Sequence, residues 1–168
     1  SVDPKTNTVV TGFETYKADL VNVIPAQMAG AVARDAGLAT ANRFCAIDPA
    51  TMRSAVDPAI FVVGDSSVAG DMPKSAFAAN SQAKVVAQTL RAELTAARAF
   101  PPRYLNTCWS MITADDTVKV GGTYAPKDGK IAAVTTFVSQ LDETAQLRHQ
   151  QTEENYGWYA GITTDIFG

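Results

Sequence analysis

The chain has 168 residues, a length near that of one ordinary domain, and its 46% hydrophobic content is enough to build a core. Its net charge of −3 comes from scattered charges of both signs, and no run of lysines or arginines could neutralise a nucleic-acid backbone, so we expect no nucleic-acid partner. The longest uncharged apolar stretches, such as 60–64, fall far short of the roughly 20 residues that a membrane-spanning helix requires.

The chain begins with short elements. Residues 8–14 and 19–24 are rich in β-branched side chains and are predicted to be strands, with Pro25 ending the second. Apolar residues at helical spacing then predict a short helix over 26–36, and Gly37 supplies its C-terminal stop.

The middle of the chain contains the most apolar run. Residues 44–47 are interpreted as a strand, and 60–63 form a continuous apolar run of strand length that we expect to be buried on both faces, as in parallel sheets. Pro73 suits the first turn of the longest predicted helix, 74–98. The apolar stripe of that helix consists of Val86, Leu90 and Leu94.

A pair of prolines at 101 and 102 interrupts the pattern and places a boundary between two structural units at about residue 100. Beyond it we expect two strands joined through the turn-rich stretch 126–129, and then a helix. These three elements are predicted at 118–124, 131–138 and 141–154. The fold class indicated is α+β.

The two cysteines, Cys45 and Cys108, are too few for a disulfide scaffold and lack metal-ligand spacing, with the single His149 far from both, so no metal site is expected. A redox role remains open for one of them. Cys45 is interpreted as a small apolar side chain in a strand, although a Cys45–Cys108 disulfide is conceivable in an oxidising compartment. His149 is expected to be solvated on a polar helix face.

The strand that ends in Gly64-Asp65 is the most informative segment, because ligands of open α/β sheets gather at such strand ends. Gly64 leaves room for a ligand, and the Asp65 carboxylate can accept hydrogen bonds from sugar or ribityl hydroxyls. The alternative is an ordinary strand-to-turn exit, since Gly-Asp is common there.

Residues 56–65 resemble the second FAD-binding motif of the disulfide-reductase-like flavoproteins, in which the aspartate, here Asp65, binds the ribityl chain of the flavin. Upstream, 19–27, with Pro25, resembles the strand that leads back to their FAD domain.

Five further segments are similar to flavocytochrome c sulfide dehydrogenase, flavoprotein subunit. They are Met72-Pro73-Lys74-Ser75, 79–84, 104–110, 157–159 and Phe167-Gly168. The resemblance implies that 1–99 are the C-terminal portions of FAD- and NAD-binding α/β domains. It also implies that 100–168 form a small α+β flavin-binding domain.

The resemblance shows what the sequence lacks as well. A Gly-x-Gly-x-x-Gly stretch after a strand is absent, so the loop that would cradle the FAD pyrophosphate is expected upstream of Ser1. The family's covalent flavin attachment is expected there too, together with one cysteine of its redox-active pair. The chain lacks the charged-then-apolar layout of a signal peptide, so any export signal has been removed or was never part of this sequence. We therefore expect this fragment alone to bind FAD weakly or not at all.

Cys108 is the candidate catalytic residue. In the family, the matching cysteine pairs with one from the N-terminal half, and sulfide attack on that disulfide opens the reaction. A buried structural thiol is the alternative. The helix start at Met72, Pro73 and Lys74 would stabilise negative charge on a reduced flavin through its free N–H groups. Trp109 is a candidate to line the flavin, as are Trp158 and Tyr159, with ordinary core packing as the alternative.

The implied protein is a periplasmic flavoenzyme that oxidises sulfide and passes electrons through FAD to a cytochrome c subunit. One rival is a sulfide:quinone or NADH:quinone oxidoreductase, although 100–168 show no basic amphipathic helix for membrane attachment. Another rival is a non-catalytic domain that docks a cytochrome. Apolar surface left open by absent neighbours favours a homo-oligomer of the fragment.

Overall fold

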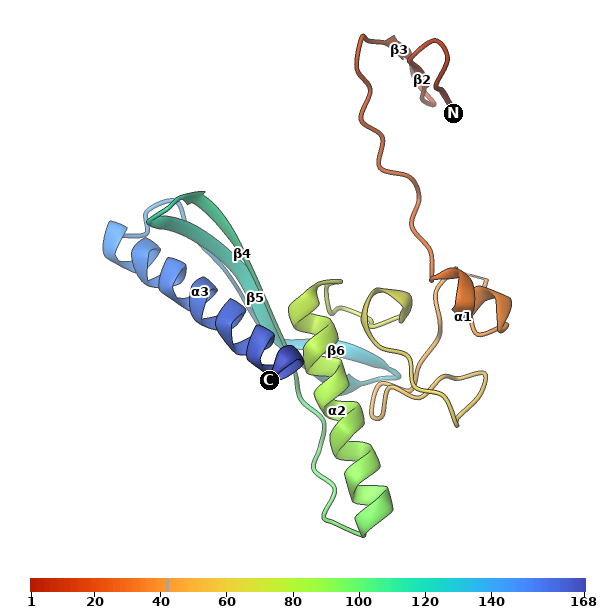
Figure 1. Ribbon diagram of the computed structural model, residues 1–168, viewed down its shortest axis with the longest axis vertical. Coiled ribbons are helices and arrows are strands. Elements are labelled where there is room, and N and C mark those ends of the chain that lie inside the picture. The colour runs from red at the N-terminus through yellow and green to blue at the C-terminus, as the bar shows by residue number, and fades with distance from the viewer. Residues whose placement is uncertain (42) are drawn as a thin grey trace.

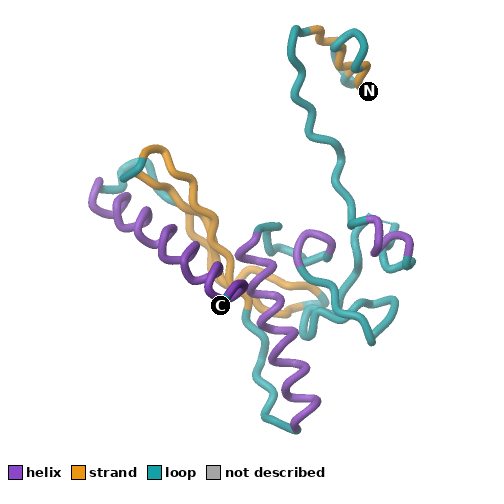
Figure 2. Tube along the Cα trace, in the orientation of Figure 1, coloured by secondary structure: helices purple, strands orange, loops and turns teal. Residues whose placement is uncertain are grey.

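Helices and two three-stranded antiparallel sheets make up the computed structural model, which describes residues 1–41 and 43–168 (Figures 1 and 2). The α+β class is therefore confirmed. The interpretation of 1–99 as portions of FAD- and NAD-binding domains stays a prediction.

The N-terminal sheet stands apart from the rest, at the end of an extended segment over 18–30 (Figure 1). Its strands are β1 Val2–Asp3, β2 Thr8–Val10 and β3 Thr15–Lys17. The predicted strand at 8–14 is thus shorter, and the one at 19–24 is wrong. Leu20 and Ile24 are 87% and 81% exposed, and the extended backbone there belongs to neither sheet. β-branched residues favour strands only where neighbouring strands pair with them.

The segment from 31 to 75 contains little regular structure. Helix α1, Ala31–Asp35, is shorter than the predicted 26–36, and the expected stop is confirmed because Gly37 adopts a φ of 71° just after it. Cys45 and Phe61 form only isolated bridges in place of the two predicted strands.

The run at 60–63 is also not buried as expected, since Ile60 and Val63 are each 37% exposed. A strand is buried on both faces only when neighbouring strands and covering helices surround it. Among the described residues, Phe61 bridges Arg53 alone. The short 3-10 helix η1, Gly64–Ser66, follows directly.

Helix α2, Ala76–Thr95, lies within the predicted 74–98 and is the long helix in the middle of the chain (Figure 1). The Ser75 side chain caps it by accepting from the Ala78 amide at 3.0 Å. The predicted stripe is wrong at Leu94, which is 81% exposed. The buried residues of the helix are Ala78, Gln82 and Val85 instead.

The C-terminal sheet has the order β4-β5-β6, all antiparallel. Its strands are β4 Tyr104–Thr113, β5 Asp116–Lys127 and β6 Lys130–Val138. The predicted hairpin is confirmed, and its turn is tight because Asp128 and Gly129 both adopt positive φ, 51° and 76°. Strand β4 was not predicted, although it carries Cys108.

Helix α3, Ala145–Phe167, lies along β4 and β5 (Figure 1). It begins near the predicted position but runs well beyond 154. Thr144 caps its start by accepting from the Leu147 amide at 3.2 Å. No helix among the described residues is both long and apolar enough to cross a bilayer.

The main core cluster draws on residues before and after position 100. Met52, Met72 and Val85 pack in it with Tyr104 and Ile131. Tyr104 is fully buried and its hydroxyl donates to the Pro49 carbonyl at 2.7 Å. Helix α2 and the end of the sheet that carries Tyr104 and Ile131 therefore share one core. The boundary predicted at residue 100 stays a prediction.

Candidate functional site

A corner of the molecule brings together η1, the start of α2 and strand β4. The contacts run without interruption from Asp65 to Cys108. The Lys74 ammonium donates to the Asp65 carbonyl, the adjacent Ser75 bonds Asn106, and the Asn106 amide lies against the Cys108 sulfur. The structure thus joins the predicted strand end to the predicted redox thiol.

The Gly64-Asp65 exit is shaped by backbone geometry and by helix α2. Gly64 has a φ of 69°, in the left-handed region that favours glycine, and its amide donates to the buried side chain of Gln82 at 2.7 Å. The Ser67 hydroxyl donates to the Gly64 carbonyl at 2.8 Å. The Asp65 side chain is exposed and accepts no hydrogen bond from a described residue. Its carboxylate is therefore available to an external donor.

Lys74 holds this exit against the helix start. Its ammonium donates to the carbonyls of Asp65 and Ser67, at 2.5 and 2.9 Å, and lies 4.1 Å from the centroid of the Phe44 ring. Burial lowers the pKa of Lys74, while the nearby Asp65 charge raises it. The lysine is engaged by the loop carbonyls, and its additional charge beside a flavin stays a prediction.

Cys108 lies on β4 with a half-buried thiol. Its sulfur is 3.7 Å from Asn106 Nδ2 and 3.9 Å from Asn106 Oδ1. Tyr124 lies nearby on β5. Burial raises the pKa of its phenol, and the negative charges of Cys108 and Asp71 raise that pKa further. Gly122 makes room for that phenol, since a Cβ at Gly122 would lie 3.3 Å from the hydroxyl oxygen.

The sheet face that carries Cys108 is open beyond this corner. Cys108 is paired with Val120, and Val120 with Val138, so the three side chains form a cross-strand row. Val120 and Val138 are 51% and 60% exposed. The thiol therefore lies at the rim of an apolar surface that nothing in the described chain covers.

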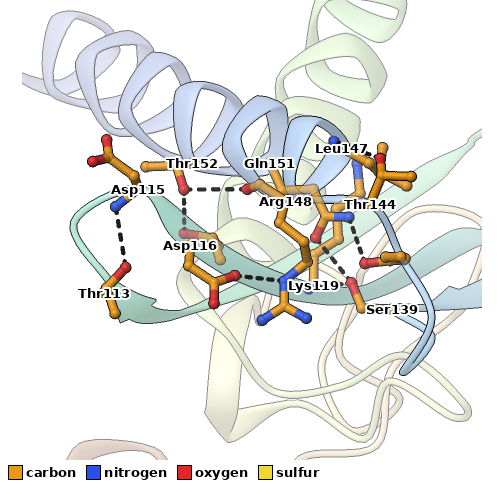
Figure 3. Close-up of polar contacts among 12 residues, drawn as sticks. Thr113, Asp115, Asp116, Lys119, Ser139, Thr144, Leu147, Arg148, Gln151 and Thr152 are labelled. Carbon is orange, nitrogen blue, oxygen red and sulfur yellow. Dashed lines mark hydrogen bonds and ion pairs between the residues drawn. The ribbon is translucent and has the colours of Figure 1, made fainter.

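Helix α3 covers the opposite face, and polar contacts fix its position (Figure 3). The Thr152 hydroxyl lies 2.7 Å from that of Thr117, and both residues are buried. Arg148 Nε and Asp116 Oδ1 form an ion pair at 2.6 Å. These contacts tie α3 to the face of the sheet opposite Cys108.

Trp109 points to this second face, since neighbouring residues of a strand face opposite ways. Its ring packs with those of Phe77 and Trp158, with centroids 6.1 and 5.8 Å away. The indole N–H of Trp109 is buried and has no acceptor within the described part of the chain. Trp109 and Cys108 thus lie on different sides of the sheet.

The other predicted residues lie as follows. Met72 is 4% exposed, and its side chain belongs to the core with its sulfur 3.5 Å from Gln82. Pro73 is exposed at the entrance to α2. Pro25 is exposed in the extended segment, outside the corner (Figure 1). Whether any of them contacts a flavin stays a prediction.

Both cysteines are free thiols. Cys45 is completely buried, and burial raises the pKa of its thiol. The small apolar role expected for Cys45 agrees with this burial.

Sequence reasoning missed Asn106, Gln82 and Tyr124. Each is buried beside the corner. Gln82 and Asn106 lie within the family-like segments 79–84 and 104–110, which could have indicated them, although no role was assigned to either. Among the described residues there is also no cluster of metal-ligating side chains.

A comparison with protein families supplies an independent finding. Residues 100–167 match the family described as flavocytochrome c sulphide dehydrogenase, flavin-binding. The match covers β4, β5, β6 and α3, including Cys108, Asn106 and Trp109. The similarity expected from the sequence motifs is therefore confirmed for this part of the chain, and it indicates a flavoprotein oxidoreductase. Residues 100–167 are therefore similar to the flavin-binding family of flavocytochrome c sulphide dehydrogenase.

Proposed function

We propose that the chain serves an FAD-dependent sulfide dehydrogenase of the periplasm that passes electrons to a cytochrome c subunit. Its corner from Asp65 to Cys108 would face the flavin. The carrying observation is the unbroken set of contacts that joins the Gly64-Asp65 exit to the Cys108 thiol. The family match at 100–167 supports the flavin, and the family's name supports sulfide and cytochrome c.

The donors and acceptors at the corner fit a flavin. The Asp65 carboxylate is exposed and suits ribityl hydroxyls. The amides of Ala76 and Phe77 lie in the first turn of α2 and have no acceptor within the helix, so they suit the electron-rich edge of a ring. The apolar row of Val120 and Val138 suits a flat aromatic surface.

The bound flavin would supply a two-electron acceptor. The chain's own contribution starts at Cys108, in disulfide linkage with a cysteine that the family resemblance places upstream. The sulfur of hydrosulfide bonds to one sulfur of that disulfide as the S–S bond breaks, and the electron pair leaves on the other sulfur as a thiolate. The proton stays on the added sulfur until solvent removes it. Cys108 is the sulfur that leaves as the thiolate, and strand β4 holds it at the open sheet face.

Rapid-mixing measurements on the intact flavoprotein test this role. Cys108→Ser should slow sulfide-dependent flavin bleaching by at least about a hundredfold, because the disulfide that hydrosulfide attacks can no longer form. Reduction by dithionite should be unaffected. Cys45→Ala is the matched control, as it removes the other thiol of this chain and should bleach normally.

Unchanged bleaching in Cys108→Ser would show that the thiol takes no part. Reduction of a quinone analogue faster than cytochrome c by the intact protein would favour the quinone-linked rival. Retained cytochrome binding without any sulfide-dependent bleaching in the wild type would favour a docking domain.

A further inference from the structure

Asn106 is nearly inaccessible, with 1% of its surface exposed, and it is two residues before Cys108 on β4. Residues two apart on a strand share a face, so the amide and the thiol lie on the same side of the sheet. A buried amide needs partners for its oxygen and for its two N–H groups. The partners of Asn106 determine how it is oriented toward the sulfur.

Ser75 fixes that orientation. Its oxygen accepts from the Ala78 amide at 3.0 Å as the cap of α2. Its O–H is then free to donate, and the acceptor is Asn106 Oδ1 at 2.5 Å. The Ser75 hydroxyl holds the Asn106 oxygen, and the Asn106 nitrogen lies slightly closer to the Cys108 sulfur than that oxygen does, at 3.7 against 3.9 Å. The start of α2 therefore sets the direction of the amide dipole at the thiol.

The amide can serve the sulfur in both protonation states. Nδ2 lies 3.7 Å from the sulfur and can donate to a thiolate, and Oδ1 at 3.9 Å can accept from a thiol. Both distances are within the range of hydrogen bonds to sulfur. A donor to a negatively charged acceptor is stronger than one between neutral groups, so the amide favours the thiolate. The Tyr124 phenol is near enough for Cys108 to influence its pKa, and Gly122 leaves room for that phenol.

We propose that Asn106, oriented by Ser75, is a positioning residue that holds the Cys108 sulfur toward the open sheet face and stabilises it as a thiolate. Its value to catalysis rests on the proposed function, since the thiolate is the species that leaves when a disulfide is attacked and that reacts next. The effect on the thiol itself is a property of the described chain and needs neither flavin nor sulfide.

Alkylation of the chain by iodoacetamide at neutral pH, followed by mass spectrometry of the Cys108 peptide, tests the proposal. Asn106→Asp keeps the size and the acceptor for Ser75 but replaces the donor by a negative charge. We expect alkylation of Cys108 to slow by roughly threefold to tenfold, the size of effect expected for one hydrogen bond to a charged sulfur offset partly by the lower nucleophilicity of a stabilised thiolate. The pH profile of the rate should move to higher pH.

Thr107→Val is the matched control. Thr107 is next to Cys108 but on the opposite face, so the rate should stay within about twofold of the wild type. The buried Cys45 reports folding in the same digest, since it reacts only if the variant opens. An unchanged rate and pH profile in a folded Asn106→Asp variant would overturn the proposal.

A measurement on the wild type keeps the proposal falsifiable if Asn106→Asp fails to fold. The side-chain amide resonances of ¹⁵N-labelled Asn106 should shift as the Cys108 thiol titrates, and Cys108→Ser should abolish that shift. Resonances that do not respond would refute the contact. If the Asn106 resonances shift with the Cys108 titration but Cys108→Ser oxidises sulfide normally, the proposed function is refuted while the role of Asn106 stands.

Discussion

The hydroxyl pair between α3 and the sheet offers a quantitative test of how this helix is held on the sheet. Thr152 and Thr117 lie 2.7 Å apart, oxygen to oxygen, and are 2% and 0% exposed. Thr152→Val preserves the shape of the side chain and removes one hydroxyl. The Thr117 hydroxyl is then buried without a partner, which costs about 1–3 kcal/mol of unfolding free energy.

The double variant Thr117→Val/Thr152→Val separates this cost from a loss of packing. Replacing both partners by apolar groups of the same shape is close to neutral, so the double variant should be more stable than Thr152→Val alone. The resulting coupling energy should be roughly 1–2 kcal/mol. Thr164→Val is the control, because Thr164 is exposed near the end of α3 and its change should stay within about 0.5 kcal/mol.

Equilibrium unfolding in urea, followed by circular dichroism, gives these free energies if the slope of the transition is the same in all variants. Additive losses in the double variant would refute the reasoning, since they would mean that the two hydroxyls are stabilised independently. A loss below about 0.3 kcal/mol in Thr152→Val would place water between the helix and the sheet.

Two further predictions concern the sheet and its acid sensitivity. Gly121→Ala should destabilise by about 2 kcal/mol or more in urea, because a Cβ there would lie 2.3 Å from the Asn106 carbonyl oxygen and backbone must move. A loss below about 0.5 kcal/mol would contradict this. The hydrogen bond from Lys130, followed by one from the Ala133 amide, holds the pKa of Asp71 below its usual range. The stabilisation is therefore present above about pH 4 and is lost as pH falls through the lower folded pKa. Asp71→Asn should flatten the fall of the urea midpoint over that window, and an unchanged slope would count against the pairing.

The comparison of sequence and structure shows where local patterns suffice. The turn at Asp128-Gly129 and the stop at Gly37 were predictable, because positive φ is a property of few residue types. Helix α2 was predictable from its length and its entry at Pro73. Strand β4 was missed because its buried positions include the polar Asn106, so its sequence does not show the alternation of an ordinary amphipathic strand.

The segments that were predicted as strands but form none share one cause. The segments 19–24 and 60–63 have strand composition, yet neither forms a regular strand in the described chain. Backbone hydrogen bonds of a strand need a neighbour, and the sequence of one segment does not say whether a neighbour is present. Helix α3 continued past Gly157 and Gly161 because its inner face packs on β5 and its end is tied by the Lys84–Asp165 ion pair at 2.7 Å.

The sequence by itself determined the family resemblance and the chemistry of two residues, the Asp65 carboxylate and the Cys108 thiol, because side-chain chemistry and short motifs are local. Only the tertiary structure decided what stands beside them. Lys74 is engaged by the loop carbonyls, Trp109 faces away from Cys108, and Asn106 faces the thiol. Which groups meet depends on the pleat of β4 and on the docking of α2 against it, and these are set by contacts between segments distant in the chain.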